Sequence, residues 1–557
     1  MLETLPFYKT KRKVKVDALI LLTVVIVFAF LILFVLFPLI KVAISSIVDD
    51  QGKLSLEGIR EVFSKGYYAT ALINSFRLAL IVAAISTIIG YIIAFAVTRV
   101  EIPLKGFFRN LTIIPIISPP FVLALAMIFL FGRQGLITRQ LLGIKDSNIY
   151  GLKSLVVVQA LTGVPIAFLT ISAMLENMDP AVEDAAMSLG AGRLHIFRTV
   201  TLPLSVSGIA SAFILVMIES LTDFANPVIL GGNYNVLSVQ IYSEVTSFFN
   251  LRVAAILSMA LLLPSLILFI VQRYYISQRS YVTISGKPSY QGKQIKDKGI
   301  VNILFAFCLL FALIVVGLYG VVIFGSFTKV WGVNLSLTLK HYKEALTMGF
   351  GSLKNSFEIS LVSAPIGSLL GLIIAFLTIR KSFFGRKFME ALSLLTFAVP
   401  GTVIGIGYVL AFNKPPISIN GTALILIIAL LFRNIPVAVE SGVSILYQID
   451  PNIEEASTAL GANSFTTFRK ITLPLLKSAL FSGMVYEFVR AMTAVSSIIF
   501  LVSARWQLVT VSIMEQVEQA NFGTASAQVT IMLIIILLAI ALMGFSIGRF
   551  GRGEYGL

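Results

Sequence analysis

The sequence has very little of the chemistry that a metal centre or a disulfide scaffold needs. Its 557 residues include one cysteine, Cys308, and two histidines, His195 and His341. A single cysteine cannot form an internal disulfide, and two distant histidines do not make a His-rich metal site. We therefore expect no resident metal and no cofactor in this chain.

Charged residues are also scarce. They make up 13% of the chain, whereas 57% of the residues are hydrophobic, which leaves too little polar surface for a soluble protein of this length. The composition therefore predicts a membrane protein, with the lipid bilayer as its surroundings. The net charge of +16 is then expected from Lys and Arg that flank membrane spans, and we expect no nucleic-acid partner.

Nucleotide-binding and catalytic motifs are missing as well. The stretch "GKPSYQGKQ" at 286–294 resembles a phosphate-binding loop only superficially, since five residues separate its glycines and Gln294 stands where Ser or Thr must reach Mg²⁺. The apolar runs hold no cluster of catalytic His, Asp or Cys, which argues against a membrane-embedded enzyme. The sequence therefore predicts a protein that is not itself an enzyme.

Long apolar runs are abundant. About 20 apolar residues cross the hydrocarbon core of a bilayer. Twelve runs qualify as candidate spans, near 18–47, 71–98, 111–131, 152–175, 204–231, 252–272, 300–324, 356–380, 391–412, 421–447, 476–502 and 524–547. An even number places both termini on one side, and the basic cluster at 9–15 assigns that side to the cytoplasm. The loop 132–153 carries four basic residues on the side predicted to be outside, so a re-entrant segment there stays open.

The chain contains an internal duplication. Residues 179–203 and 450–474 align with twelve of 25 residues identical, and 74–99 and 355–380 both begin with Asn-Ser-Phe and end in Arg. We therefore predict two homologous six-span modules, joined by a basic cytoplasmic linker. Such a tandem implies a pseudo-two-fold axis along the membrane normal, with a pathway between the halves. The predicted boundaries are 1–272, 273–299 and 300–557.

The repeated polar segment is predicted to form a short capped helix. Asp-Pro at 179–180 and 450–451 supplies a capping side chain followed by proline at the first helical position. Gly190 and Gly461 fall where that helix would end. The Thr-Leu-Pro that follows is expected to stop a second helical piece before the next span. Two retained copies favour two docking sites for a cytoplasmic partner, and an ordinary connector between spans is the alternative.

The two segments resemble the EAA motif of the permease subunits of bacterial ABC importers. That motif has Glu-Ala-Ala, a glycine four residues on, and an aliphatic-x-Leu-Pro step further along. Here Asp184 replaces the Glu of the first copy, and Ser457 replaces the second Ala of the second copy. The resemblance implies coupling helices that dock two ATP-binding subunits. The docking residues that it implies are Glu183, Asp184, Ala185, Ala186, Gly190, Leu202, Pro203, Glu454, Glu455, Ala456, Ser457, Gly461, Leu473 and Pro474.

The resemblance also implies a fold and a function. It implies an all-α polytopic protein with the type I ABC importer permease fold, in the bacterial cytoplasmic (inner) membrane, which receives its cargo from an extracytoplasmic substrate-binding protein. The stretches "ESLTDFANPVILGG" at 219–232 and "FAVPGTVIGIGYVLAFN" at 397–413 are similar to fused permeases for ferric iron. Importers for aminoethylphosphonate, thiamine, polyamine or sulfate share much of this pattern. An ion-coupled secondary transporter is a more distant alternative.

Four of the charged residues within predicted spans lie on helices at equivalent places of the two halves. They are Glu219 and Asp223 in the fifth span, and Glu487 and Arg490 in the eleventh. A charged side chain at mid-bilayer costs about 2.5–3.5 kcal/mol on insertion scales, so each should face protein or water. We predict that these residues line the central pathway or pair across it. A structural ion pair, or a position close to the headgroups, is the alternative.

Overall fold

The computed structural model of the chain describes residues 18–49, 52–276 and 294–551, and these residues are mostly helical. The basic cluster at 9–15 and most of the predicted linker lie outside the described residues. Helices of the first part of the chain are α1 (Ala18–Leu31), η1 (Ile32–Leu36), α2 (Phe37–Ile47), α3 (Glu57–Ser64), α4 (Gly66–Arg99), α5 (Lys105–Ile117), α6 (Val122–Phe131), η2 (Leu136–Leu141), α7 (Leu152–Asn177), α8 (Pro180–Ser188), α9 (Arg193–Ile196), η3 (Phe197–Thr201), α10 (Leu202–Thr222), α11 (Ala225–Leu230), α12 (Leu237–Thr246), α13 (Leu251–Ile270) and η4 (Val271–Ile276).

The second part of the chain repeats this order of helices. Two antiparallel hairpins, β1–β2 and β3–β4, are its strands within the described residues. Its elements are α14 (Lys298–Phe327), β1 (Thr328–Val330), β2 (Asn334–Leu337), α15 (Lys340–Thr347), α16 (Phe350–Arg380), α17 (Arg386–Leu395), α18 (Gly401–Phe412), β3 (Asn413–Lys414), β4 (Ile417–Ser418), α19 (Ala423–Leu446), α20 (Asn452–Ala459), α21 (Ser464–Thr467), η6 (Phe468–Thr472), α22 (Leu473–Leu475), α23 (Lys477–Met492), α24 (Val509–Glu518) and α25 (Phe522–Gly551).

The all-α, polytopic fold is confirmed. Ten helical runs of the described residues are long and apolar enough to cross a membrane. Of the twelve predicted runs, 391–412 is divided between α17 and α18, 111–131 is likewise divided between α5 and α6, and 476–502 holds the 16-residue α23 followed by irregular chain. Pro400 explains the first break, because it has no backbone N–H to continue a helix. Residues 142–151 of the loop left open as re-entrant are irregular, and Gly151 N donates to Leu230 O at 2.8 Å.

Each half is built on a three-helix bundle. In the first half α4 packs along α7 and α10, and in the second half α16 packs along α19 and α23. Glycine allows the close approach at the same place in both: a Cβ added to Gly90 would lie 2.6 Å from the Cβ of Ala167, and one added to Gly371 would lie 2.5 Å from the Cβ of Ala438. Small residues at such crossings are typical of membrane helix packing.

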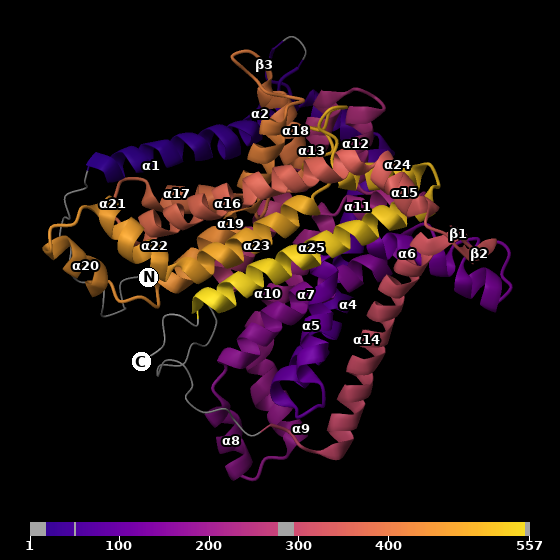
Figure 1. Cartoon of the computed structure of the whole chain (residues 1–557), viewed down its shortest axis with the longest axis horizontal. Coiled ribbons are helices and arrows are strands. Elements are labelled where there is room, and N and C mark those ends of the chain that lie inside the picture. Colours follow the sequence, from indigo (N-terminus) through magenta and orange to yellow (C-terminus); the bar gives the residue numbers. More distant parts are fainter. Residues whose placement is uncertain (1–17, 50–51, 277–293, 552–557) are drawn as a thin grey trace.

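The first helices of each half pack on the other half. The α1–α2 run lies against α17 and α18, whereas α14 lies against α4, α5 and α6 (Figure 1). A hydrogen bond stabilises each of these contacts between the halves. Tyr408 Oη donates to Phe34 O at 2.8 Å, and Trp331 Nε1 donates to Phe129 O at 2.9 Å. The two bundles are therefore held together by interlocked helices.

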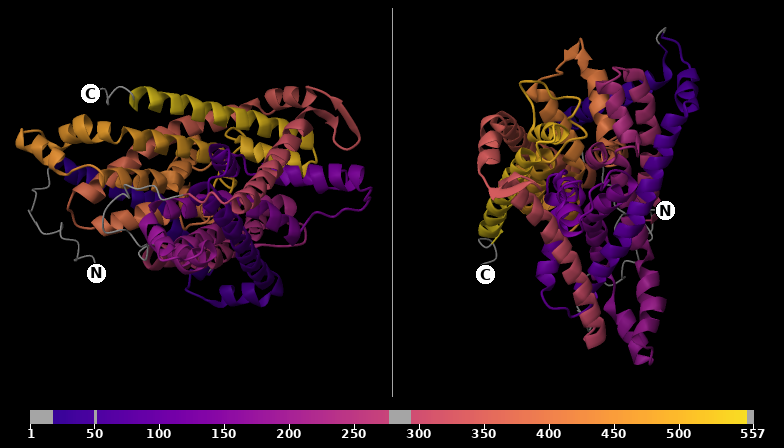
Figure 2. Two further views of the ribbon diagram at one scale, coloured as in Figure 1. Left: turned by 90° about the horizontal axis from the view of Figure 1, so that it is seen from below. Right: turned by 90° about the vertical axis from the view of Figure 1, so that its right-hand side faces the viewer.

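The bundles meet at one end of the molecule and diverge toward the other. Figure 1 shows α8 and α20 at separate tips, and the further views in Figure 2 agree. We call the end that carries α8 and α20 the motif end. At the opposite end each half contains the same internal hydrogen bond. Ser75 Oγ accepts from Leu237 N at 2.9 Å in the first half, and Ser356 Oγ accepts from Val509 N at 2.8 Å in the second.

Candidate functional site

Both repeated segments form the predicted capped helix, α8 or α20, and a second short helix, α9 or α21, follows the glycine turn. We call each of these segments, 179–203 and 450–474, a hairpin. Asp179 Oδ1 accepts from Ala181 N at 2.9 Å, and Asp450 Oδ1 accepts from Asn452 N at 2.9 Å. Gly190 and Gly461 end the helices with the same φ of +85°, and a Cβ built on either meets nothing within 4 Å. The left-handed backbone conformation, and not a lack of space, therefore favours glycine at these two turns.

The predicted stop at Thr-Leu-Pro is wrong. The chain runs without a break from Arg193 through α9 and η3 to the end of α10, and Pro203 lies in the first turn of α10. The π-helical turn before the proline explains this, because its wider hydrogen bonds, such as Leu202 N to Phe197 O, shift the register where proline lacks a donor. Each hairpin is therefore continuous, or nearly so, with the span that follows it.

An arginine at the end of α4 binds the first hairpin to its half. Arg99 Nη2 donates to Leu175 O at 3.0 Å and to Met178 O at 3.5 Å, at the end of α7. Arg99 Nη1 lies 3.8 Å from Glu183 Oε2, and Glu183 Oε1 accepts from Thr201 Oγ1 at 2.7 Å. The Glu183 side chain is 19% exposed and is turned toward its own half.

The second half repeats these contacts with equivalent residues. Arg380 Nη2 donates to Leu446 O at 2.9 Å and to Ile449 O at 2.7 Å. Arg380 Nε lies 3.2 Å from Glu454 Oε1, which also accepts from Thr472 Oγ1 at 3.3 Å. We call Arg99–Glu183–Thr201 and Arg380–Glu454–Thr472 the motif clamps. Each clamp joins the ends of α4 and α7, or of α16 and α19, to the hairpin and to the following span.

The clamps change which predicted docking residues face outward. The carboxylates of Glu183 and Glu454 pair with arginines of this chain. Ser457 is 7% exposed, and its Oγ lies 2.9 Å from Thr467 Oγ1. The remaining predicted residues lie on the hairpins with varied exposure. Exposed ones are Ala185, Gly190, Leu202, Pro203, Glu455, Ala456, Gly461 and Pro474, and partly exposed ones are Asp184, Ala186 and Leu473.

The most exposed apolar residues of the hairpins were not in the predicted docking set. Leu189 is 88% exposed and its equivalent Leu460 is 89% exposed. Val182 and Ile453 are also exposed at equivalent positions. Four apolar side chains exposed in matching pairs, at the ends of two polar hairpins, form a surface suited to contact with another protein. The sequence signal was available, since both leucines directly precede the glycine that the two copies share.

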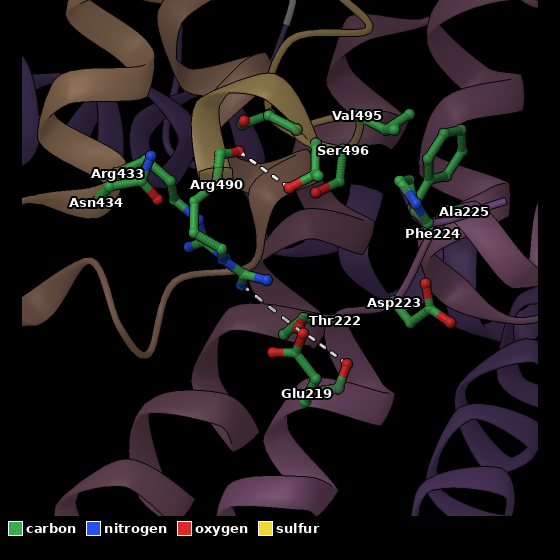
Figure 3. A pocket seen from close by; sticks show the side chains of 14 residues that line it. Glu219, Thr222, Asp223, Phe224, Ala225, Arg433, Asn434, Arg490, Val495 and Ser496 are labelled. Carbon is green, nitrogen blue, oxygen red and sulfur yellow. Dashed lines mark hydrogen bonds and ion pairs between the residues drawn. The ribbon is translucent and has the colours of Figure 1, made fainter. Parts of the chain in front are cut away.

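A polar cavity lies between the two halves. Arg490 Nη2 of α23 lies 3.8 Å from Glu219 Oε1 of α10, with side chains 32% and 47% exposed. Figure 3 shows Arg490 extending toward Glu219 across this cavity. The alignment that places Asp179 over Asp450 also places Glu219 over Arg490. The ion pair therefore joins equivalent positions of the two halves, where the pseudo-two-fold axis passes.

Asp223, the residue after α10, is held by amides. Its Oδ2 accepts from Gln159 Nε2 and from Asn226 Nδ2, both at 2.8 Å, and Gln159 Oε1 accepts from Ser220 Oγ at 2.5 Å. Asn226 is 4% exposed, and its Oδ1 has no hydrogen-bond partner among the described residues. This amide network fixes the Asp223 carboxylate at the cavity wall.

Arg433 belongs to the same site and was not predicted. Its Nη1 donates to Thr396 O at 2.8 Å and also to Val399 O, two buried carbonyls at the break between α17 and α18. Asn434 beside it is 8% exposed. The arginine therefore supplies hydrogen bonds to the carbonyls at the helix break, while its guanidinium borders the cavity, as in Figure 3. A charged residue inside a predicted span was the signal that could have identified it.

Three neighbouring cavities have both Glu219 and Arg490 in their walls. One of about 130 Å³ adds Asp223, Arg433 and Asn434, and one of about 110 Å³ adds Asp223, Asn226 and Gln159. The third, of about 400 Å³, extends to Arg273, which pairs with Glu440 at 2.8 Å. The ion pair thus lies where these spaces adjoin. Glu219 and Arg490 therefore pair between the halves, and their place along a substrate pathway stays a prediction.

Glu487 does not line this cavity, so the structure gives no support to its predicted place along the pathway. It is 1% exposed, and its carboxylate lies against Gly367 of α16. It lines none of the three spaces. Residues three positions apart share a helix face, yet Glu487 packs against the neighbouring α16 whereas Arg490 extends into the cavity.

Two equivalent helical bundles, a polar cavity between them and a clamped hairpin on each define the permease component of a membrane transporter. The chain belongs to the family described as binding-protein-dependent transport system inner membrane component, whose model matches residues 86–280 and 367–552. The family match thus occurs twice, once in each half.

Known relatives extend over most of the chain. It is 35% identical to the ferric transport system permease protein FbpB of Actinobacillus pleuropneumoniae, over 98% of this chain and 81% of the relative. It is 36% identical to the putative ferric transport system permease protein FbpB 1 of Haemophilus influenzae, over 88% of this chain and 79% of the relative. The sulfate transport system permease protein CysT of Escherichia coli is 28% identical, over 36% of this chain and 79% of its own.

Proposed function

We propose that this chain is the fused permease subunit of an ATP-driven importer for ferric iron in the bacterial cytoplasmic membrane. The observation that carries the choice of cargo is the identity of 35% and 36% with two ferric permeases over most of the chain. An extracytoplasmic substrate-binding protein delivers the iron at the end opposite the motif end. The motif end and both termini face the cytoplasm.

Two ATP-binding subunits dock on the two hairpins. The exposed Leu189 and Leu460 enter apolar grooves of these partners, because such large apolar side chains favour burial. Movement of each partner then reaches the membrane helices through the motif clamps, because each clamp ties its hairpin to three spans of its half. ATP hydrolysis itself takes place in the partner subunits.

The cargo passes between the halves. The bundles meet at the end opposite the motif end and diverge at the motif end, so the chain has the arrangement of an importer open to the cytoplasm. The cavity at Glu219 and Arg490 lies on this route. Closing the hairpins together would reverse the arrangement and open the opposite end to the binding protein.

Sulfate is the second candidate cargo, because the Escherichia coli sulfate permease is 28% identical to part of this chain. We rank importers for aminoethylphosphonate, thiamine and polyamine below those for iron and sulfate, and an ion-coupled secondary transporter last. A secondary transporter would have no use for two clamped hairpins.

Uptake by proteoliposomes tests this choice. The permease, its ATPase and its binding protein would be reconstituted with ⁵⁵Fe³⁺ or ³⁵S-sulfate outside and ATP inside. We expect ATP-dependent accumulation of ⁵⁵Fe and none of ³⁵S. Accumulation of sulfate instead of iron would contradict the proposed cargo, and uptake that needs no ATP would contradict the importer class.

A further inference from the structure

We infer that Glu219, Asp223 and Asn226 form a transient cation site in the central cavity, and that Arg490 is its built-in counter-ion, displaced when the cargo cation binds. The inference rests on the proposed function and deepens it by naming a stopping place for the cargo. Ligands come from the first half and the counter-charge comes from the second.

Three oxygen donors at the cavity are available to a cation. Among the described residues Asp223 Oδ1 accepts a single long hydrogen bond, of 3.4 Å from Asn226 N, and Glu219 is half-exposed to the cavity. Asn226 Oδ1 is the strongest indication of a cation ligand, because this buried oxygen has no hydrogen-bond partner among the described residues. A buried acceptor is rarely left unpaired in a folded protein. Carboxylate and amide oxygens are the ligands that hard cations prefer.

The equivalent place in the second half offers no such donors. The alignment places Arg490, Ala494 and Ser497 over Glu219, Asp223 and Asn226. The duplication therefore supplies one set of cation ligands, and puts a guanidinium opposite them. At 3.8 Å, with both side chains partly exposed, the Glu219–Arg490 pair is a loose contact that a multivalent cation can replace.

The small number of carboxylates suits transport and not storage. Within the part of the chain that the structure describes, no group of three or more His, Cys, Asp or Glu is placed to hold a metal ion. A site with two carboxylates and one amide binds a cation weakly. A permease needs this, because a cargo that binds too tightly cannot leave.

Displacing Arg490 also has a mechanical consequence. Its bond to Glu219 joins α23 to α10 across the axis. A cation at Glu219 and Asp223 releases that bond, so the presence of cargo loosens the contact between the halves. Arg490 thereby neutralises the empty site and gives way when the site is filled.

Terbium luminescence measures this exchange directly. Tb³⁺ is a trivalent, oxygen-seeking probe, and it would be titrated into the detergent-purified permease with its ATPase. We expect weak binding to the unmodified protein and loss of binding in Glu219→Gln and in Asp223→Asn. In Arg490→Gln the competing charge is removed, so Tb³⁺ should bind about tenfold more tightly. Ferric nitrilotriacetate should displace the bound Tb³⁺.

Matched variants make the test specific. Arg490→Lys keeps the counter-charge and should bind like the unmodified protein. Glu358→Gln removes an exposed carboxylate that pairs with Lys354 at 3.8 Å, outside the three cavities, and should change nothing. The double variant Glu219→Gln with Arg490→Gln has no unpaired charge at this contact and should still lack binding. Retention of the ATPase on purification establishes that each variant is assembled.

Two results would overturn the inference. One is equal Tb³⁺ binding by the unmodified protein, Glu219→Gln and Asp223→Asn. The other is unchanged affinity in an assembled Arg490→Gln. The proposed function fails separately, in the uptake assay: iron uptake without a Tb³⁺ site refutes only the inference, whereas an assembled complex that takes up no iron refutes the function.

Discussion

The two halves of the molecule agree at the motif end and differ at the cavity. At the motif end each half has a capped helix, a glycine turn at φ +85° and an Arg-Glu-Thr clamp. At the cavity, Glu219 of one half faces Arg490 of the other. On the proposed function, the duplicated chain keeps alike the two surfaces that would each meet one copy of the ATPase. The halves differ where a single cargo would pass between them.

The clamps themselves are alike in residues but not in tightness. Arg380 Nε lies 3.2 Å from Glu454, whereas Arg99 Nε has no hydrogen-bond partner among the described residues. Beside the first clamp, Ile295 pairs with Val100, and a cavity of about 590 Å³ separates this strand-like contact from the hairpin. The first clamp is therefore the looser of the two.

The largest effect is expected at the docking surface. Changing Leu189→Glu together with Leu460→Glu places charges where apolar contact is proposed, and should abolish retention of the ATPase during purification. Each single change should weaken retention equally, because the hairpins are equivalent. Phe384→Glu, at a fully exposed apolar residue between α16 and α17, is the control and should retain the ATPase. Full retention by the double variant would refute docking at these leucines.

Breaking the two clamps should reduce the stability of the protein by different amounts. Arg380→Met leaves the Glu454 carboxylate, 11% exposed, without its partner, and should destabilise the protein by about 3–5 kcal/mol. Arg99→Met should cost less, because its contact with Glu183 is longer. Thermal unfolding of the two variants in detergent measures the difference, with Lys354→Met at an exposed ion pair as the control. Equal losses would show that the observed difference in tightness has no energetic meaning.

Overpacking the bundles should affect both halves alike. Gly90→Ala and Gly371→Ala each insert a methyl group less than a van der Waals distance from an alanine of the neighbouring helix. Each should cost about 1–3 kcal/mol, and the two shifts in unfolding temperature should match. Gly317→Ala is the control, because a Cβ there meets nothing within 4 Å. A loss confined to one half would contradict equivalent packing.

The smallest effect is expected at the glycine turns. Gly190→Ala and Gly461→Ala meet no steric obstacle, but force a left-handed conformation on a residue with a Cβ, at about 1–2 kcal/mol each. Asparagine tolerates this conformation better, so Gly190→Asn and Gly461→Asn should lose less. Thermal unfolding again provides the measurement. Alanine variants as stable as the unmodified protein would show that the turns relax.

Local patterns predicted the parts of the structure that depend on neighbouring residues. Asp-Pro and Gly mark the hairpins because caps and turns are decided within a few residues, and apolar runs mark spans because length and composition decide insertion. The duplication was readable because two distant stretches could be compared directly. These signals predicted the fold class and both capped helices, and they brought Glu219 and Arg490 forward as candidates.

Long-range contacts account for what the sequence did not reveal. The closing arginine of each repeat was visible, but its partner, Glu183 for Arg99, lies far along the chain, and only folding brings the two together. Glu487 and Arg490 are three residues apart, yet one contacts α16 and the other the cavity. Pro203 failed as a stop signal because a π-helical turn absorbs the missing donor.

Our central proposal is that the ATPases, acting through two equivalent hairpins, move iron through a cavity whose two sides differ in charge. ATP-dependent ⁵⁵Fe³⁺ uptake by proteoliposomes that hold the complete complex tests it most directly, with the unmodified permease compared with Leu189→Glu plus Leu460→Glu and with Phe384→Glu. The account predicts uptake by the unmodified permease and by Phe384→Glu, and none by the double variant. Undiminished iron uptake by the double variant, or no iron uptake by the assembled unmodified complex, would contradict it.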